Sequence, residues 1–123
     1  MWNTINSLSL EEKVGQLFFI GISGTEFDDT TRKLINDISP GGVCLFSRNI
    51  RTAEQVRGLL DSITNALPVI PFLSVDQEGG LVDRLRRIVT PMPSAAKLQK
   101  PENAVELARI TAEVLSILGF NMN

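Results

Sequence analysis

Two carboxylates and a glycine pair stand together in the stretch SVDQEGG, residues 74–80, directly after the phenylalanine and leucine of an apolar run. Along an extended segment, Asp76 and Glu78 would point to one side, roughly 6.5–7 Å apart from the rise of a strand. Paired carboxyl groups hydrolyse glycosidic bonds at separations of about 5–5.5 Å with retention and about 6.5–9.5 Å with inversion. Alternatively, Asp76 caps a glycine turn while Glu78 is solvated or paired with an arginine. The spacing leaves both interpretations open.

The glycines and arginines behind these carboxylates extend the candidate site. Gly79 and Gly80 permit a close backbone approach or a positive φ. A phosphate cradle is the sharper interpretation, but neither a P-loop lysine nor a GxGxxG pattern follows. Among the arginines after them, one that points into a site, such as Arg84, could bind hydroxyls or a carboxylate through its planar guanidinium. For Arg86 and Arg87 a solvated surface is the better interpretation.

Arg48 and Asn49 follow an earlier apolar segment and should lie in the same layer as Asp76. They could line a site or tie down the loops around it, and we favour the second role. Cys44, inside the apolar segment, is interpreted as a core residue. We therefore treat Arg48 and Asn49 as residues that support the loops.

The composition narrows the chemistry. With 123 residues, 43% of them hydrophobic, the chain can form one compact domain. Twelve basic and fourteen acidic residues without a run of either sign give no electrostatic case for binding nucleic acid or a membrane surface. The chain has no histidine, which removes Ser-His and Cys-His nucleophiles, a histidine general base and most zinc sites. We expect neither a metal nor a cofactor.

The expected location is cytoplasmic. The start, MWNTINSLSLEEK, lacks the basic and apolar regions of a signal peptide. The apolar runs fall well short of the roughly 18 residues that a membrane span needs. A single cysteine cannot form an internal disulfide, which fits a reducing compartment.

Alternating strands and helices are expected to position these side chains. Continuously apolar segments predict strands at 17–22, 42–46 and 72–76. A capping pattern predicts a short helix that begins after Ser9. Apolar periodicity predicts further helices at about 28–38, 52–67 and 101–118, of which the second begins with a capping pattern at Thr52 and the third stops at Gly119. Residues 77–100 are expected to be a long loop, and a further strand should begin near Phe120.

Continuously apolar strands indicate a parallel sheet that is covered by helices. A small doubly wound sheet and the first part of a (β/α)8 barrel both fit this α/β pattern. Barrels typically need about 250 residues, and the alternation breaks off as a fourth strand opens. We interpret residues 1–123 as the N-terminal portion of a TIM barrel, about three βα units truncated at the start of the fourth strand.

Four stretches, in order, resemble the N-terminal part of family 3 glycoside hydrolases of the β-N-acetylhexosaminidase type: EEKVGQLFFIG, GGVCLFSRNI, SVDQEGGLVDRL and LGFNMN. They span almost the whole chain, and VDQEGG followed by an arginine is quite specific to this subgroup. The resemblance implies a barrel enzyme that removes terminal N-acetylglucosamine from β-linked substrates with retention. Its bacterial substrates are usually cell-wall muropeptides, and chitooligosaccharides have the same linkage type.

The resemblance also implies roles for individual residues. An aspartate in the position of Asp76 and an arginine in the position of Arg84 contact the sugar, and neither is the nucleophile. Glu78, with Gly79 and Gly80, would order the loop around Asp76. The family's nucleophilic aspartate and its acid/base histidine lie further along the barrel. We therefore expect no catalytic residue in this chain, and no glycosidase activity from it alone.

Three alternatives remain open. A segment of a family 3 β-glucosidase is one rival, although β-glucosidases usually differ in the VDQEGG region. The family usually has a basic residue directly after the two glycines, whereas this chain has Leu81, so of the basic contacts of this loop with the sugar only that of Arg84 is expected. A non-catalytic sugar-binding or assembly module could self-associate, or pair with a complementary barrel fragment, through open sheet edges. A small flavodoxin-like anion binder would require a complete chain, which an ending inside an expected strand disfavours.

Overall fold

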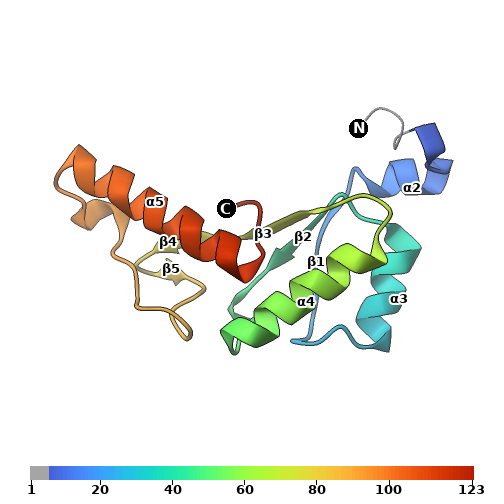
Figure 1. The fold of residues 1–123 in the computed structure, drawn as a ribbon, viewed down its shortest axis with the longest axis horizontal. Coiled ribbons are helices and arrows are strands. Elements are labelled where there is room, and N and C mark those ends of the chain that lie inside the picture. Colours follow the sequence, from blue (N-terminus) through green and yellow to red (C-terminus); the bar gives the residue numbers. More distant parts are fainter. Residues whose placement is uncertain (1–5) are drawn as a thin grey trace.

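The computed structural model describes residues 6–123 and has the expected alternation of strands and helices (Figure 1). Three parallel strands in the order β1-β2-β3 form the main sheet: β1 (Phe19–Gly21), β2 (Gly42–Leu45) and β3 (Phe72–Val75). The sheet is accompanied by the α-helices α2 (Leu10–Gly15), α3 (Asp29–Ile38), α4 (Ala53–Ala66) and α5 (Pro101–Leu118). The strands predicted at 17–22, 42–46 and 72–76 and each predicted helix are present, although the strands are shorter than the apolar segments that predicted them.

Local hydrogen bonds define where the helices begin. Before α2, Ser9 Oγ accepts from the Glu12 N–H at 3.1 Å, and the Glu12 carboxylate accepts from the Ser9 N–H at 2.7 Å. This is the reciprocal capping box that the sequence predicts. Before α4 only half of a box forms, because Thr52 accepts from Gln55 whereas the Gln55 side chain accepts from the Arg51 N–H.

The core lies between one face of the sheet and the helices. Side chains alternate along a strand, so Val43 and Leu45 of β2 are buried together with Leu73 and Val75 of β3. The helices contribute further buried side chains, which include Ile35, Val56, Leu60 and Ile63. On the opposite face of the sheet, Phe19 and Phe72 are exposed. Among residues 6–123, the helices therefore cover one face of the sheet.

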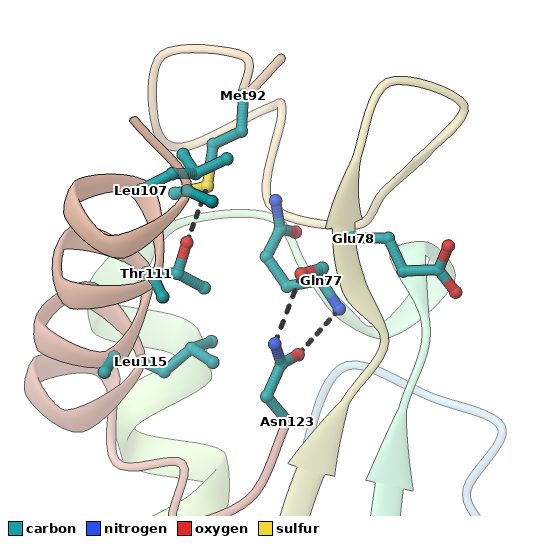
Figure 2. A pocket seen from close by; sticks show the side chains of 10 residues that line it. Gln77, Glu78, Met92, Leu107, Thr111, Leu115 and Asn123 are labelled. Carbon is teal, nitrogen blue, oxygen red and sulfur yellow. Dashed lines mark hydrogen bonds between the residues drawn. The ribbon is translucent and has the colours of Figure 1, made fainter. Parts of the chain in front are cut away.

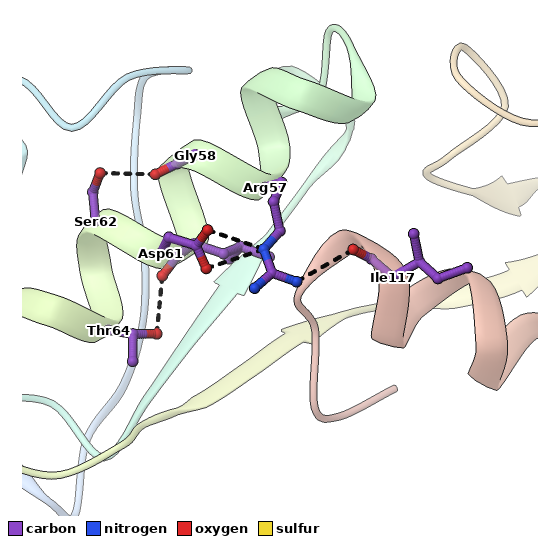
Figure 3. A network of polar contacts seen from close by, with 7 residues as sticks. Arg57, Gly58, Asp61, Ser62, Thr64 and Ile117 are labelled. Atoms are coloured by element: carbon purple, nitrogen blue, oxygen red, sulfur yellow. Dashed lines mark hydrogen bonds and ion pairs between the residues drawn. The ribbon is translucent and has the colours of Figure 1, made fainter.

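Helix α5 contacts α4 through its C-terminal end (Figure 3). Arg57 of α4 donates from Nε to Asp61 at 3.0 Å and from Nη1 to the carbonyl oxygen of Ile117 at 3.4 Å. The helix then ends at Gly119, whose φ of 99° is the left-handed conformation that glycine adopts readily. In the part of the chain that is described, no helix has both the length and the apolar character to cross a membrane.

The prediction of an uninterrupted loop over 77–100 was wrong. Strands β4 (Gln77–Gly79) and β5 (Val82–Asp83) form an antiparallel hairpin, and a 3-10 turn follows at Ala95–Lys97. The hairpin is too short and too polar for a hydrophobic pattern to reveal it. Where a further strand was expected, after α5, Met122 forms an isolated parallel bridge with Ser74 of β3.

Candidate functional site

Asp76 and Arg84 converge at the carboxyl end of the sheet. Asp76 directly follows β3, and Arg84 directly follows β5. The Arg84 Nη2 lies 3.7 Å from the Asp76 Oδ2, and their side chains are 28% and 53% exposed. This distance permits electrostatic attraction but exceeds hydrogen-bond length. The carboxylate and the guanidinium therefore both keep hydrogen-bonding positions for a ligand.

An aromatic ring supports the arginines of this site. The guanidinium carbon of Arg48 lies 4.7 Å from the centroid of Phe46, and that of Arg84 lies 6.0 Å from it. Both distances are within the range of cation–π attraction. The buried Nε of Arg84 has no hydrogen-bond partner among the described residues. Phe46 thus contacts two cationic groups, of which Arg84 approaches the Asp76 carboxylate.

Asn49, in contrast, is fully buried below this rim. Its Oδ1 accepts from the Phe46 N–H at 2.9 Å, and its Nδ2 donates to the carbonyl oxygens of Ile22 at 3.1 Å and Gly24 at 2.6 Å. Arg48 reaches the same Ile22 oxygen at 3.3 Å. These bonds join the loop after β1 to the loop after β2, an arrangement that suits a role in supporting the loops.

The glycine pair has both features that its sequence permits, a positive φ and a close approach by another segment. Gly79 and Gly80 have φ values of +82° and +61°. A Cβ on Gly79 would lie 2.2 Å from the Pro93 carbonyl oxygen, and one on Gly80 would lie 2.6 Å from the Ser94 Cβ. Positive φ and close backbone approach thus occur at the same two positions. Leu81, at the tip of the hairpin, is 98% exposed.

The residues that order the hairpin are Gln77 and Asp83, which sequence reasoning missed. They are 4% and 3% exposed, and the Gln77 Nε2 donates to the Asp83 Oδ1 at 2.8 Å. Glu78 is exposed, and its carboxylate forms no hydrogen bond or ion pair within residues 6–123. The period of two along a strand could have indicated this, because it turns residue 77 away from the side of Asp76 and Glu78.

The three arginines in and after the hairpin also differ in their contacts. Arg86 donates to the Gly80 carbonyl oxygen at 3.0 Å, so its exposed guanidinium also braces the turn. Arg87 is exposed. Of the three arginines, Arg84 is the one that lies beside Asp76.

A pocket of about 360 Å³ lies between α5 and the hairpin (Figure 2). Apolar side chains of α5 form one wall, and Gln77, Met92 and Asn123 form much of the other. Figure 2 shows the Glu78 side chain pointing away from this space. Asp76 and Arg84 do not line the pocket, so it is separate from the candidate site. Within residues 6–123, no cluster of three or more histidine, cysteine or acidic residues could hold a metal ion.

Comparisons with known proteins agree on one family. Residues 9–123 match the model of the glycosyl hydrolase family 3 N-terminal domain. A β-hexosaminidase from Thiobacillus denitrificans is 41% identical over 103 residues, which cover 79% of this chain and 28% of that protein. Another, from Photobacterium profundum, is 33% identical over 80% of this chain and 31% of its own length. The chain thus spans less than a third of these curated relatives.

Solved structures show the same relationship in three dimensions. A family 3 β-N-acetylglucosaminidase from a Paenibacillus species matches with a TM-score of 0.88 and 38% identity, over 95% of this chain and 24% of its own. The expected α/β fold, the N-terminal part of the larger barrel-like domain of these proteins, is confirmed.

Proposed function

Because the chain belongs to glycosyl hydrolase family 3 through its N-terminal domain, we propose that it is the N-terminal segment of a retaining β-N-acetylhexosaminidase. Residues 1–123 then form a partial barrel domain that ends at the start of the fourth strand. The proposed substrate has terminal β-linked N-acetylglucosamine, as in cell-wall muropeptides or chitooligosaccharides, which fits a role in peptidoglycan recycling. The similar proteins named β-hexosaminidase and β-N-acetylglucosaminidase support this substrate class.

The observation that carries the proposal is the approach of Arg84 to Asp76 at 3.7 Å. A carboxylate accepts hydrogen bonds from sugar hydroxyls, and a guanidinium donates to their oxygens. Because the two groups are too far apart to hydrogen-bond each other, both remain available to the sugar. Hydrogen bonds to ring hydroxyls strengthen as the sugar distorts toward an oxocarbenium ion, so Asp76 can assist hydrolysis without transferring a proton.

Catalysis itself requires groups outside this chain. The family resemblance assigns the nucleophile to a later aspartate and the acid/base role to a histidine, and the chain has no histidine. The 123-residue chain alone is therefore expected to bind the sugar without hydrolysing it. Turnover of a chromogenic N-acetylglucosaminide by the purified chain would contradict this expectation.

Calorimetric titration of the chain with N-acetylglucosamine tests the site. Asp76→Asn should weaken binding by about 10- to 150-fold, because a hydrogen bond to a charged group contributes about 1.5–3 kcal/mol. Asp37→Asn, which alters an exposed carboxylate paired with Lys33 on α3, is the matched control and should leave the affinity unchanged. Equal effects of the two substitutions would refute the site. Tighter binding of glucose than of N-acetylglucosamine would favour the β-glucosidase alternative.

A second candidate role is self-association through the sheet. Strand β1 is at the edge of the order β1-β2-β3, and Phe19 and Phe72 are exposed on the uncovered face. Unpaired strand edges readily pair with another chain. Light scattering should then give a mass that rises with concentration, whereas a constant monomer mass would exclude this role.

A further inference from the structure

We propose that Gln77 is a positioning residue that sets the separation between Asp76 and Arg84. The inference rests on the proposed sugar site, because it concerns the two groups that would bind the sugar. Gln77 directly follows Asp76, yet its side chain is buried on the other side of the strand and is 4% exposed. It therefore acts from behind the site, without touching a ligand there.

The Gln77 amide holds both sequence neighbours of Arg84. Its Nε2 donates to the Asp83 Oδ1 at 2.8 Å, and its Oε1 accepts from the Leu85 N–H at 3.1 Å. The second oxygen of Asp83 accepts from the Met92 N–H at 3.0 Å. Asp83 and Leu85 are themselves buried. One side-chain amide thus bonds the side chain of Asp83 and the backbone of Leu85, the two neighbours of Arg84.

The main chain of Gln77 is anchored as well (Figure 2). Its N–H donates to the Asn123 Oδ1 at 2.9 Å, and its carbonyl oxygen accepts from the Asn123 Nδ2 at 3.3 Å. On the other side of Asp76, Val75 is fully buried in the core. Asp76 therefore lies between two fixed residues, and the Gln77 side chain links that fixed backbone to the backbone that carries Arg84.

With an aspartate at position 83, the chemistry of this link requires an amide at position 77. The position must donate to the Asp83 carboxylate and accept from a backbone N–H, and a glutamine amide supplies both functions. A glutamate would still accept from Leu85, but it would place a second carboxylate against Asp83 in a buried site. Leaving buried polar groups without partners is costly, so the network favours a single arrangement of Asp76 and Arg84.

An exchange of the two side-chain types tests the proposal. Gln77→Glu removes the donor to Asp83. The double variant Gln77→Glu/Asp83→Asn restores the bond with its direction reversed, since the new amide at 83 can donate to the new carboxylate at 77 and still accept from Met92. The readout is the NMR resonance of the Arg84 Nε–H, assigned with Arg84→Lys. This resonance is measured with and without Asp76→Asn in three backgrounds: the wild type, Gln77→Glu and the double variant. The stability of each protein to urea is measured alongside.

If Gln77 positions the pair, Asp76→Asn shifts the Arg84 resonance in the wild-type background, shifts it far less with Gln77→Glu, and shifts it fully again in the double variant. A purely structural role would lower stability without changing this coupling. An equal shift in all backgrounds, or none in the wild type, overturns the proposal. Should Gln77→Glu not fold, the double variant decides, because loss of the shift there also overturns it.

The sugar titration separates this inference from the proposed function. Gln77→Glu should weaken N-acetylglucosamine binding about tenfold, comparable to the loss of one hydrogen bond to a charged group, and the double variant should recover it. If the Asp76–Arg84 coupling falls with Gln77→Glu and returns in the double variant, but the wild-type chain binds no sugar, the sugar site is wrong and the positioning role of Gln77 stands. If sugar binds and Gln77→Glu leaves both coupling and affinity unchanged, the positioning role is wrong and the sugar site stands.

Discussion

Gly79 faces the carbonyl oxygen of Pro93 so closely that a Cβ at Gly79 would lie 2.2 Å from that oxygen. The segment 92–94 thus packs directly on the glycine turn, and the Gly80 N–H donates to the Met92 carbonyl oxygen at 2.9 Å. This contact holds the hairpin against the chain that leads to α5. Because Asp76 and Arg84 flank the hairpin, the close approach at Gly79 also shapes the candidate site.

Gly79→Ala is expected to destabilise the fold by at least about 2 kcal/mol. The substitution forces a side chain into the left-handed region and into a backbone atom that cannot move freely. Gly58→Ala is the matched control, since Gly58 lies in α4 with no atom within 4 Å of its added Cβ. It should stabilise the protein by about 0.5–1 kcal/mol through helix propensity. Urea denaturation measures both, and effects of the same sign would contradict the prediction.

Asn123→Ala is expected to release the backbone of Gln77. The main-chain groups of Gln77 would lose their partners at 2.9 and 3.3 Å, and each buried group left unsatisfied costs about 1–3 kcal/mol. Hydrogen exchange of the Gln77 amide should accelerate, whereas that of the Val43 amide in the central strand should change less. Asn65→Ala, at an exposed position of α4, provides the control. Unchanged protection at Gln77 would show that Asn123 does not anchor it.

Asn49→Asp should be among the most destabilising single-atom changes in this chain. Asn49 is fully buried and donates to two carbonyl oxygens. A carboxylate at this position cannot donate either hydrogen bond, and its negative charge would repel both carbonyl oxygens. We expect a loss of at least about 3 kcal/mol. Asn36→Asp, exposed on α3, should cost less than about 1 kcal/mol from the nearby helix C-terminus. Thermal unfolding compares the two, and similar melting temperatures would argue against the tie between the loops.

The N-cap of α3 should make stability depend on pH. The Thr31 backbone N–H donates to the Asp28 Oδ1 at 2.8 Å and holds the pKa of Asp28 below its ordinary value of 3.8, with a smaller contribution from the Thr31 side chain. A depressed folded-state pKa contributes stability above the unfolded value, and this is lost as the pH falls through the folded value. Asp28→Asn retains a cap but cannot ionise.

The difference in urea midpoint between wild type and Asp28→Asn should therefore change as the pH falls from about 5 to below the ordinary pKa of Asp28. The change should run against the wild type, because protonation removes the charge that favours its cap. A difference that stays constant over this range would show that the Asp28 charge does not stabilise α3.

The sequence by itself determined the features that depend on near neighbours. The Ser9 cap of α2, the Thr52 cap of α4 and the Gly119 end of α5 all form where the pattern predicts them. Their hydrogen bonds span only three to five positions of the chain, so local residue types are sufficient to specify them. The family resemblance, rather than spacing, predicts that Asp76 and Arg84 contact the same sugar. In the structure the two side chains lie 3.7 Å apart.

Only the tertiary structure decided which polar residues support that pair. Gln77 lies between Asp76 and Glu78 in the sequence, and it is the buried residue of the three. Its backbone partner, Asn123, is 46 positions away. Whether a glutamine or a neighbouring glutamate is buried depends on which side of the strand meets α5 and the returning chain. That choice is set by the packing of distant segments, because a buried amide is stable only where those segments bring it matching partners.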